Sequence, residues 1–390
     1  MHSDTRIRPV TYGLAFYFLL GALDAVSIPY IGSFLKIAAF LPVGLLLLSL
    51  KELRIRIHRL LIFLLCFWIL ALSSLFYSVS VDRTLSADQG LTLNLMLVLM
   101  LGVLVPYNRR EVTMLYKAMI LGCWLQIVLT LVFADVSAAG RLTLRFGEST
   151  QDHNNNNTFF LLAFSHHCDQ LLRGRKRMHS LLLLLILGMV LLSGSRGALL
   201  AYALTFFFHI CVYFKNSRNA ARSILIALLV MIAVGIAFDM ILTYMPERVS
   251  MRFSWEYLEE KGTVGRTRTW GYLWKLFADS DILRMLLGHG YGTTAFLNQL
   301  NHRVAHNLYL DNLMTLGIFG MLLQIASQAT VVWVFFKRKQ YVLLGAYLGM
   351  IGMCMSLSLT ACKPLWNMMI IALAMDCNDA EPLPAAGKEA

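Results

Sequence analysis

Charged side chains are scarce in this sequence. Of its 390 residues, 14% are Asp, Glu, Lys or Arg and 58% are hydrophobic, whereas a soluble domain carries about 25% charged residues. This scarcity excludes an ordinary soluble domain and indicates a protein whose solvent is largely lipid. The net charge of +12 would suggest a nucleic-acid partner in a soluble protein. Here the basic residues stand in short loops between apolar segments, so we expect no nucleic-acid partner.

Paired cysteines, metal-binding spacings and internal repeats are also missing. The seven cysteines are an odd set, mostly inside apolar segments, and predict neither a disulfide nor a zinc site. No cleavable signal peptide is evident, because the start is polar and basic and the apolar run after it lacks a clear cleavage site. The absence of repeats gives no support to an inverted-repeat transporter. We expect no metal and no cofactor.

Apolar segments of membrane-spanning length run through the whole chain. A bilayer needs about 20 apolar residues per helix, which predicts an all-α, polytopic membrane protein of about twelve transmembrane helices, with residues 1–390 as a single membrane domain. The sixth segment is partly polar, and the tenth is too long for one upright span. The predicted spans are residues 11–29, 31–50, 58–78, 89–106, 111–134, 157–172, 178–194, 197–214, 222–244, 306–336, 341–360 and 363–377.

Basic loops set the predicted orientation. Lys and Arg gather in alternate connections, as in cytoplasmic loops, so we expect cytoplasmic N- and C-termini and a disordered cytoplasmic tail over residues 378–390. The opposite side carries two longer loops, residues 135–156 and, between spans nine and ten, residues 245–305. Loops of the second length are usually functional. The basic connections are residues 51–59, 107–110, 171–179, 215–222 and 337–340.

The longer loop is expected to contain short amphipathic helices. In the stretch RTWGYLWKLFA, the side chains of Trp270, Leu273, Trp274 and Phe277 fall on one stripe of a helix. Tryptophan favours the membrane–water interface. The stretch therefore predicts a helix lying in that interface.

Three segments on the predicted outer side hold polar residues that suit an anionic ligand. The guanidinium groups of Arg196, Arg266 and Arg268 match phosphate oxygens in two-pronged geometry. A helix N-terminus adds backbone N–H donors, and His306 at such an end can act as a general base near neutral pH. The segments are SGSRG (193–197), GRTRTW (265–270) and AHNLYLD (305–311).

Each of these residues also has a purely structural interpretation. Arg196 is equally well explained as an interfacial anchor whose side chain reaches toward the lipid headgroups. A solvated loop face explains Arg266 and Arg268, and a helix-capping or interfacial role explains His306. The sequence by itself leaves both interpretations open.

Three further motifs are interpreted as ordinary structure. Asp279-Ser280-Asp281 resembles the paired aspartates that hold a metal in sugar-nucleotide transferases, but a single such triplet favours a loop. The run His153–Asn157 predicts a turn and a helix cap. GHGYGT, residues 288–293, predicts a turn-rich loop, and without a preceding strand it is not a dinucleotide-binding motif.

The three outer segments, in their order along the chain, resemble the C-terminal signature region of the O-antigen ligase and polymerase superfamily of bacterial envelope enzymes. The resemblance is specific over roughly residues 190–320. An R-x3-L pattern beginning at Arg196 and an H-N-x9-G-x-x-G pattern beginning at His306 are typical of the ligase branch. Met321 and Leu322 stand where ligases often carry a threonine pair.

This resemblance implies a C-type glycosyltransferase-like enzyme of the bacterial inner membrane, with its active site facing the periplasm. It would transfer a polysaccharide from undecaprenyl diphosphate to lipid A–core oligosaccharide, without a metal and with inversion at the anomeric carbon. His306 would accept the proton of the acceptor hydroxyl. Arg196 and Arg266 would hold the diphosphate, with Arg268 assisting. The supporting candidates are Asn307, Tyr309 and Trp270.

Other functions remain open on the sequence alone. An O-antigen polymerase or a protein O-oligosaccharyltransferase would use the same kind of donor. A flippase for lipid-linked sugars should show charges along a route through the bundle, and a non-catalytic scaffold would not need His306. The intramembrane charges form no series; they are Asp24, Lys36, Lys117, Asp239 and Asp311.

Overall fold

The chain is mostly helical throughout the part that the computed structural model describes. In a bilayer, every backbone N–H and C=O must be paired within the protein, and a helix achieves this within one segment. The apolar runs of the sequence therefore form helices. The structure describes residues 6–28, 32–136, 141–146, 149–151, 153–174, 176–215, 243–244, 247–251, 264–360 and 362–376.

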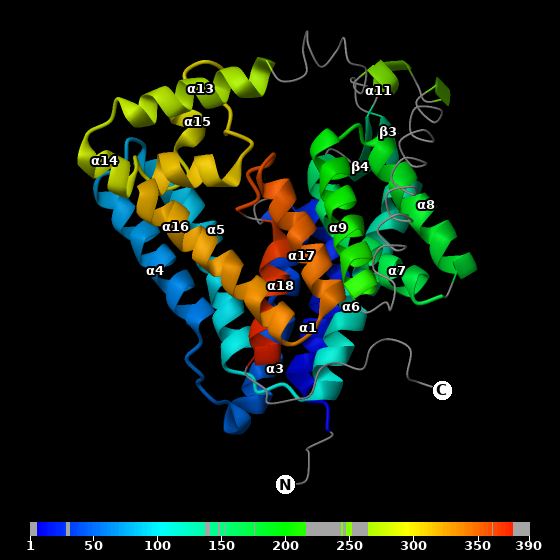
Figure 1. Ribbon diagram of the computed structural model, residues 1–390. Helices are drawn as coiled ribbons and strands as arrows, with labels where there is room; N and C mark the ends of the chain where they lie inside the picture. The colour runs from blue at the N-terminus through cyan, green and yellow to red at the C-terminus, as the bar shows by residue number, and fades with distance from the viewer. Residues whose placement is uncertain are drawn as a thin grey trace. The chain divides into compact units, whose positions relative to one another are not determined.

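The elements follow one another along the chain as shown in Figure 1. The first are α1 (Pro9–Leu19), η1 (Leu20–Ala25), β1 (Ser27–Ile28), β2 (Gly32–Ser33), α2 (Phe34–Ala38), α3 (Phe40–Leu46), η2 (Leu47–Glu52), α4 (Arg59–Ser73), η3 (Ser74–Phe76), α5 (Val81–Leu97), the π-helix η4 (Val98–Val103) and α6 (Arg109–Val132). The next are β3 (Ala134–Val136), β4 (Leu142–Phe146), β5 (Ser149–Gln151), α7 (His153–Leu172), α8 (Lys176–Leu192), α9 (Arg196–Lys215) and α11 (Glu247–Ser250). The last are α13 (Val264–Ala278), α14 (Ile282–Leu287), α15 (Thr294–Leu297), α16 (Leu308–Lys337), α17 (Tyr341–Cys354) and α18 (Lys363–Asp376).

Within the described residues, six helical segments are long and apolar enough to cross a membrane, which makes the chain a polytopic membrane protein. They are Phe34–Glu52, Arg59–Phe76, Val81–Val103, Arg109–Val132, Arg196–Phe214 and Leu308–Lys337. Three shorter apolar helices are Pro9–Asp24, Arg177–Leu192 and Tyr341–Cys354.

Not every predicted span meets these criteria. The sixth and twelfth form helices α7 and α18, but α7 is polar at both ends and α18 has only 14 residues. Residues 222–242 of the ninth predicted span and the predicted tail 378–390 lie outside the described residues. The total of twelve spans therefore stays a prediction.

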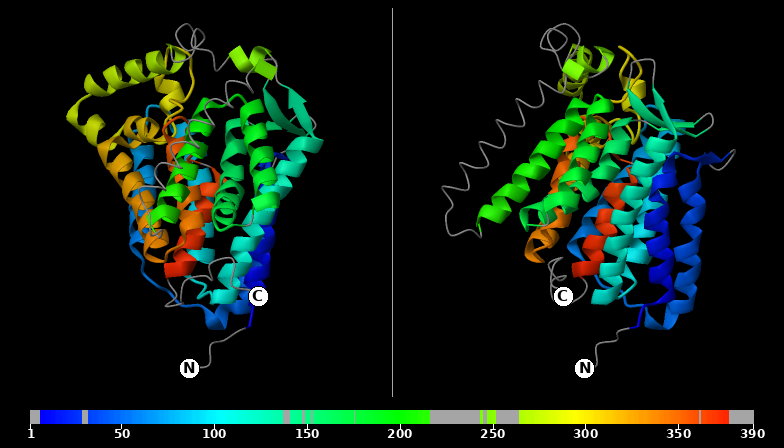
Figure 2. Two further views of the ribbon diagram at one scale, coloured as in Figure 1. Left: turned by 45° about the vertical axis from the view of Figure 1, so that its right-hand side comes forward. Right: turned by 90° about the vertical axis from the view of Figure 1, so that its right-hand side faces the viewer.

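The described residues group into two compact units. Unit 1 comprises residues 1–122, 265–340 and 353–390, and unit 2 comprises residues 123–264 and 341–352. In unit 1, α16 packs against α4, and α1 packs against α3 (Figures 1 and 2). In unit 2, α7 packs against both α8 and α9.

The fourth predicted span begins eight residues too late. The sequence placed its start at residue 89, because the residues before it are polar, whereas α5 begins at Val81. The polar residues Thr84 and Asp88 are 0% and 2% exposed, so they face the interior of unit 1. Polarity therefore marks a buried helix face here, not a loop.

Short strands add to a fold expected to be entirely helical. Unit 1 contains the antiparallel pair β1–β2, and unit 2 contains an antiparallel sheet of order β3–β4–β5. The second sheet occupies part of the predicted outer loop 135–156, where the sequence had indicated only a connection. Pairing of Thr143 with Asp135 and of Arg145 with Thr150 satisfies backbone groups that an open loop would leave to water.

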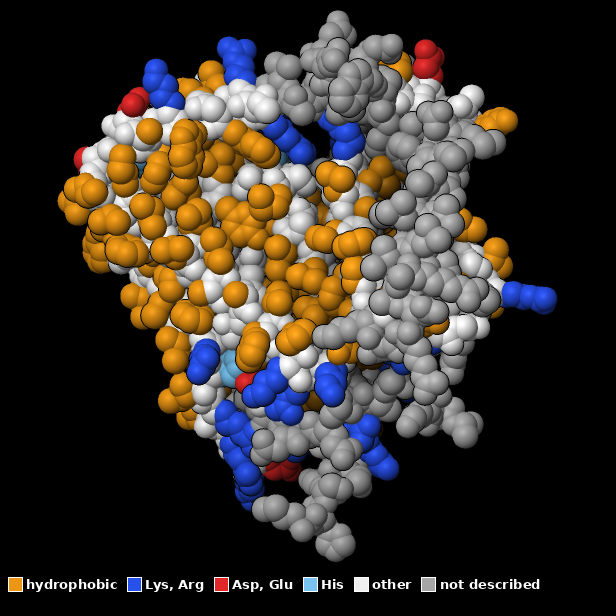
Figure 3. All heavy atoms as spheres, viewed as in Figure 1, with side chains coloured by type: hydrophobic (Ala, Val, Ile, Leu, Met, Phe, Trp, Pro, Cys, Tyr) orange, Lys and Arg blue, Asp and Glu red, His pale blue; other side chains and the backbone are white. Residues whose placement is uncertain are grey.

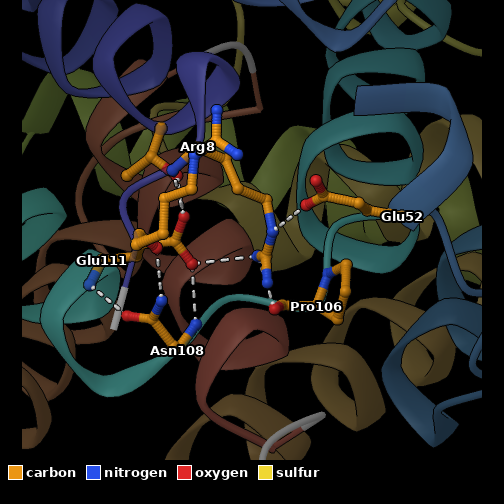
Figure 4. A network of polar contacts seen from close by, with 7 residues as sticks. Arg8, Glu52, Pro106, Asn108 and Glu111 are labelled. Carbon is orange, nitrogen blue, oxygen red and sulfur yellow. Dashed lines mark hydrogen bonds and ion pairs between the residues drawn. The ribbon is translucent and has the colours of Figure 1, made fainter. Parts of the chain in front are cut away.

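A buried ion-pair network gathers the predicted cytoplasmic segments of unit 1 (Figure 4). Arg8 donates to Glu52 at 2.8 Å and to Glu111 at 2.9 Å, and it also donates to the carbonyl of Pro106 at 2.6 Å. Asn108 donates its backbone N–H to Glu111. The N-terminal segment and the basic connections 51–59 and 107–110 therefore meet at one end of unit 1, as the loop charges predicted.

Hydrophobic side chains cover the face of unit 1 formed by α4 and α16, and Lys and Arg lie at its two ends (Figure 3). This distribution is what a lipid-facing surface requires, since a charge in the hydrocarbon is costly. Exposed apolar side chains on this face include Ile62, Ile69, Phe319, Leu322 and Trp333.

Candidate active site

Helix α13 lies across the upper end of α16 in unit 1 (Figure 1). Leu273 and Phe277 of α13 pack with Leu313 and Met314 of α16 in one buried cluster. The predicted amphipathic helix of the long loop is thus present, and it is docked. Trp274 is 59% exposed and its ring lies beside that of Phe277, so it extends the predicted stripe beyond the buried i, i+4 pair Leu273–Phe277.

The residue before His306 is held from two sides. Trp270 of α13 donates its indole N–H to the carbonyl of Ala305 at 2.7 Å. The backbone N–H of Ala305 donates to Oδ1 of Asp311 at 3.0 Å. Because Ala305 is only 1% exposed, these bonds replace water on both backbone groups. The predicted helix of the loop and the start of α16 therefore fix the peptides on either side of Ala305, the residue before His306.

His306 itself adopts a left-handed backbone conformation, with φ of 52°. Asn307 follows as the N-cap of α16, and its side chain accepts from the backbone N–H of Tyr309 at 3.0 Å and of Leu310 at 3.1 Å. A non-glycine residue at positive φ is uncommon and persists only where its surroundings enforce it. The cap and the held Ala305 supply that constraint and fix the backbone at His306.

The two arginines of α13 face different ways. Arg266 precedes Trp270 by four residues, so it lies on the helix face that turns toward Ala305. Arg268 is offset by two residues and lies on the opposite face. The exposure of the two side chains agrees with this assignment of opposite faces, because Arg266 is half-buried and Arg268 is exposed. The geometry brings Arg266 to the His306 side of α13 and leaves Arg268 on the other.

Tyr309 contributes to the packing of α16 below the site. Its hydroxyl donates to Oε1 of Gln328 at 2.7 Å. The two residues lie on either side of Gly317, where α16 departs from helical geometry with φ of 65° and ψ of −163°. Tyr309 therefore ties the short N-terminal part of α16 to its long part.

The glycine-rich loop GHGYGT supports the interruption of α16. Gly288, with φ of 78°, lies against the backbone of Thr315 and Leu316, and Gly317 lies against the backbone of Leu286. His289 N–H donates to the carbonyl of Met314, and Gly290 N–H donates to that of Thr315, each at 3.0 Å. The loop is turn-rich as predicted, and its role is to pair carbonyls that the break in α16 leaves without helical partners.

The electrostatics around this loop keep His289 neutral. Burial, followed by the nearby guanidinium of Arg284, lowers the pKa of His289, against the opposing effect of Asp281. Arg284 donates to the carbonyl of Tyr77 at 2.8 Å and lies over the Tyr77 ring. The loop is thus secured to the segment that follows η3.

The SGSRG segment lies in unit 2 and forms the turn between α8 and α9. Gly194 takes φ of 60°, which lets the chain reverse, and Arg196 is the first residue of α9. The hydroxyl of Ser195 accepts from the backbone N–H of Ala198 at 3.4 Å and caps the helix. The predicted tight turn is present, with Arg196 at a helix N-terminus.

The aspartate triplet has the structural role predicted for it. Asp281 caps α14, accepting from the backbone N–H groups of Leu283 at 2.9 Å and Arg284 at 3.0 Å. Across the described residues, no group of three or more His, Cys, Asp or Glu side chains is arranged to hold a metal ion.

Asp311 is the residue of this site that the sequence analysis undervalued. It appeared only as an isolated charge in an apolar segment, yet its carboxylate accepts from Ala305 N–H and from the hydroxyl of Ser358. A buried carboxylate needs such donors. An acidic residue one helical turn after an N-cap asparagine was the available signal, since its side chain can reach back over the cap.

Comparison with known proteins agrees with the motifs. Residues 181–325 match the O-antigen ligase family model. The match includes the SGSRG turn, α13, the glycine-rich loop and His306, and it confirms the predicted resemblance over this segment. No curated protein matches the chain at the threshold applied.

Proposed function

We propose that this protein is an O-antigen ligase. It transfers a polysaccharide from undecaprenyl diphosphate to a sugar hydroxyl of lipid A–core oligosaccharide, at the periplasmic face of the bacterial inner membrane. Both substrates are lipid-linked, which suits a catalyst that is itself a membrane protein. The matched segment supports the reaction class, and the R-x3-L and H-N-x9-G-x-x-G patterns support the ligase branch.

One observation carries the assignment of His306. A histidine held at φ of 52°, between a clamped alanine and a capping asparagine, has a conformation that helix capping alone does not require. Asn307 already supplies the cap of α16. The constrained backbone is therefore better explained by a need to present the imidazole to a substrate.

The proposed reaction is a single displacement. The acceptor hydroxyl oxygen attacks the anomeric carbon, and the bond from that carbon to the diphosphate oxygen breaks with its electrons going to the leaving group. His306 takes the hydroxyl proton. Arg266, on the same side of α13 as Trp270, and Arg196, at the N-terminus of α9, stabilise the charge that grows on the diphosphate. Arg268 assists only by raising the local positive potential.

Reconstitution tests this function. The purified protein is incubated with undecaprenyl diphosphate-linked polysaccharide and with lipid A–core, and the products are separated by size and by lipid content. The ligase assignment predicts polysaccharide attached to lipid A–core, together with free undecaprenyl diphosphate. Lengthened polysaccharide that remains on undecaprenyl diphosphate would show a polymerase, and glycan attached to an added acceptor protein would show an oligosaccharyltransferase.

A further inference from the structure

Arg141 holds the turn that carries Arg196. In unit 2 it lies immediately before β4, and its Nε donates to the carbonyl of Ser193 at 2.7 Å. Ser193 is the first residue of the SGSRG turn, three residues before Arg196. The contact fixes backbone, so it restrains the turn itself and not merely one side chain.

A second group couples Arg141 to the start of α9. The side-chain oxygen of Asn154 accepts from the hydroxyl of Ser195 at 2.7 Å and from Nη2 of Arg141 at 3.4 Å. Ser195 caps α9 through Ala198. Asn154 is therefore a shared acceptor between the arginine and the helix cap that directly precedes Arg196.

The same asparagine run contacts the turn a second time. Asn157 donates from Nδ2 to the hydroxyl of Ser193 at 2.9 Å, and Tyr202 of α9 donates to the carbonyl of Asn157 at 2.8 Å. Ser193, Ser195 and Asn157 are 4%, 6% and 1% exposed. Buried hydrogen bonds of this kind rigidify what they join, because breaking one leaves a desolvated polar group. The run was predicted to be a turn and a cap, but it forms the first turn of α7. From there it braces the SGSRG turn.

We propose that Arg141 is a positioning residue, which acts by holding Arg196 in the orientation that binds the donor diphosphate. The inference rests on the proposed function. Glycines flank Ser195-Arg196 on both sides, so without a brace the turn would sample many conformations. Ordering it before the donor arrives lowers the entropy lost on binding. Arginine suits the task because one rigid guanidinium reaches both Ser193 and Asn154, which a lysine ammonium cannot reproduce.

The test measures binding of farnesyl diphosphate, a short prenyl diphosphate, to the purified protein in detergent. Arg141→Gln should weaken binding about tenfold, because a hydrogen bond from a charged group is lost, and Arg141→Lys should lose less. Arg145→Ala is the matched control, since Arg145 lies on β4, which begins directly after Arg141, is exposed and forms an ion pair with Asp135. Should Arg141→Gln fail to fold, Asn154→Ala takes its place in the test, because it removes the acceptor that Arg141 shares with Ser195.

Two readouts separate positioning from other roles. In an Arg196→Ala background, Arg141→Gln should cause little further loss of binding, because Arg141 acts through Arg196. Hydrogen exchange of the peptide covering residues 189–204 should accelerate in Arg141→Gln and not in Arg145→Ala. A full additional loss in the Arg196→Ala background, or faster exchange with unchanged binding, would overturn the positioning role. A wild-type protein that binds no prenyl diphosphate would overturn the proposed function, and the positioning role with it, whatever the exchange shows.

Discussion

The indole of Trp270 donates a hydrogen bond to the carbonyl of Ala305 across 35 residues of sequence, at 2.7 Å. It links the loop helix α13 to the peptide immediately before His306. The backbone N–H of the same alanine, in the preceding peptide, donates to Asp311. The reactivity proposed for His306 therefore depends on helix α13.

Trp270→Phe should slow transfer without removing the helix. Phenylalanine keeps the ring but not the N–H donor, and the loss of one hydrogen bond, about 1 kcal/mol, would loosen the Ala305–His306 peptide. We expect kcat to fall about fivefold to tenfold while the KM for the donor changes little. Trp274→Phe is the matched control, because Trp274 is exposed on the same helix. Equal kinetics for the two variants would contradict the role of the clamp.

The two arginines of α13 should differ in importance. Arg266→Ala should abolish most transfer, and Arg266→Lys should restore only part of it, since a point charge does not replace the planar fork. Arg268→Ala should retain most activity, because Arg268 lies on the opposite face of the helix. The measurement is donor KM and kcat for the three variants at equal amounts in the membrane. Losses of equal size from Ala at either position would be inconsistent with this geometry.

Gly317→Ala should destabilise the protein. The φ of 65° and ψ of −163° at Gly317 belong to a region that is essentially restricted to glycine, where a side chain costs about 1–3 kcal/mol, and a Cβ would meet the backbone of Leu286. Gly271→Ala serves as control, since nothing lies within 4 Å of the Cβ it would add. We expect a lower Tm for Gly317→Ala only, measured in detergent. An unchanged Tm would mean that α14 and α16 are not in close contact at Gly317.

Stability should decline in mildly acidic solution partly through His289. Its pKa is lowered by burial and by Arg284, so the unfolded chain binds a proton more readily than the folded one. The contribution of His289 to the free energy of unfolding is therefore fully present above the ordinary histidine pKa of about 6.5. It falls as the pH drops below that value. His289→Gln should reduce the fall in Tm between pH 8 and pH 5.5. A variant with the same pH dependence as the wild type would exclude His289 as the cause.

Local pattern predicted the elements of the site better than their interactions. The SGSRG turn, the helix at α13 and the start of α16 were all indicated by spacing and turn residues, because each is encoded within a few positions. The clamp on Ala305 joins Trp270 and Asp311 through tertiary packing, and no local period records such a contact. For the same reason the asparagine run was predicted as a cap, while its place in the first turn of α7 and its contacts with Ser193 and Ser195 emerge only from the fold.

Hydropathy failed where polar residues are buried. The start of α5 was missed because Thr84 and Asp88 made the segment resemble a loop, although both face the interior. The break in α16 was foreseen only as excess length, since a conformation peculiar to glycine cannot be distinguished from an ordinary helical glycine in sequence. Both cases need knowledge of which neighbours cover the backbone.

The most direct test of the account is the single-turnover rate of His306→Ala against that of the wild type, with saturating donor and across pH, beside a separate measurement of donor binding. General-base catalysis contributes about 10²–10⁴-fold, so the variant should lose about that much rate while it retains donor binding. The acid limb of the wild-type profile should also disappear, because it reports protonation of the base. A variant that binds donor poorly but turns over the bound fraction at the normal rate would contradict the account and make His306 a binding residue.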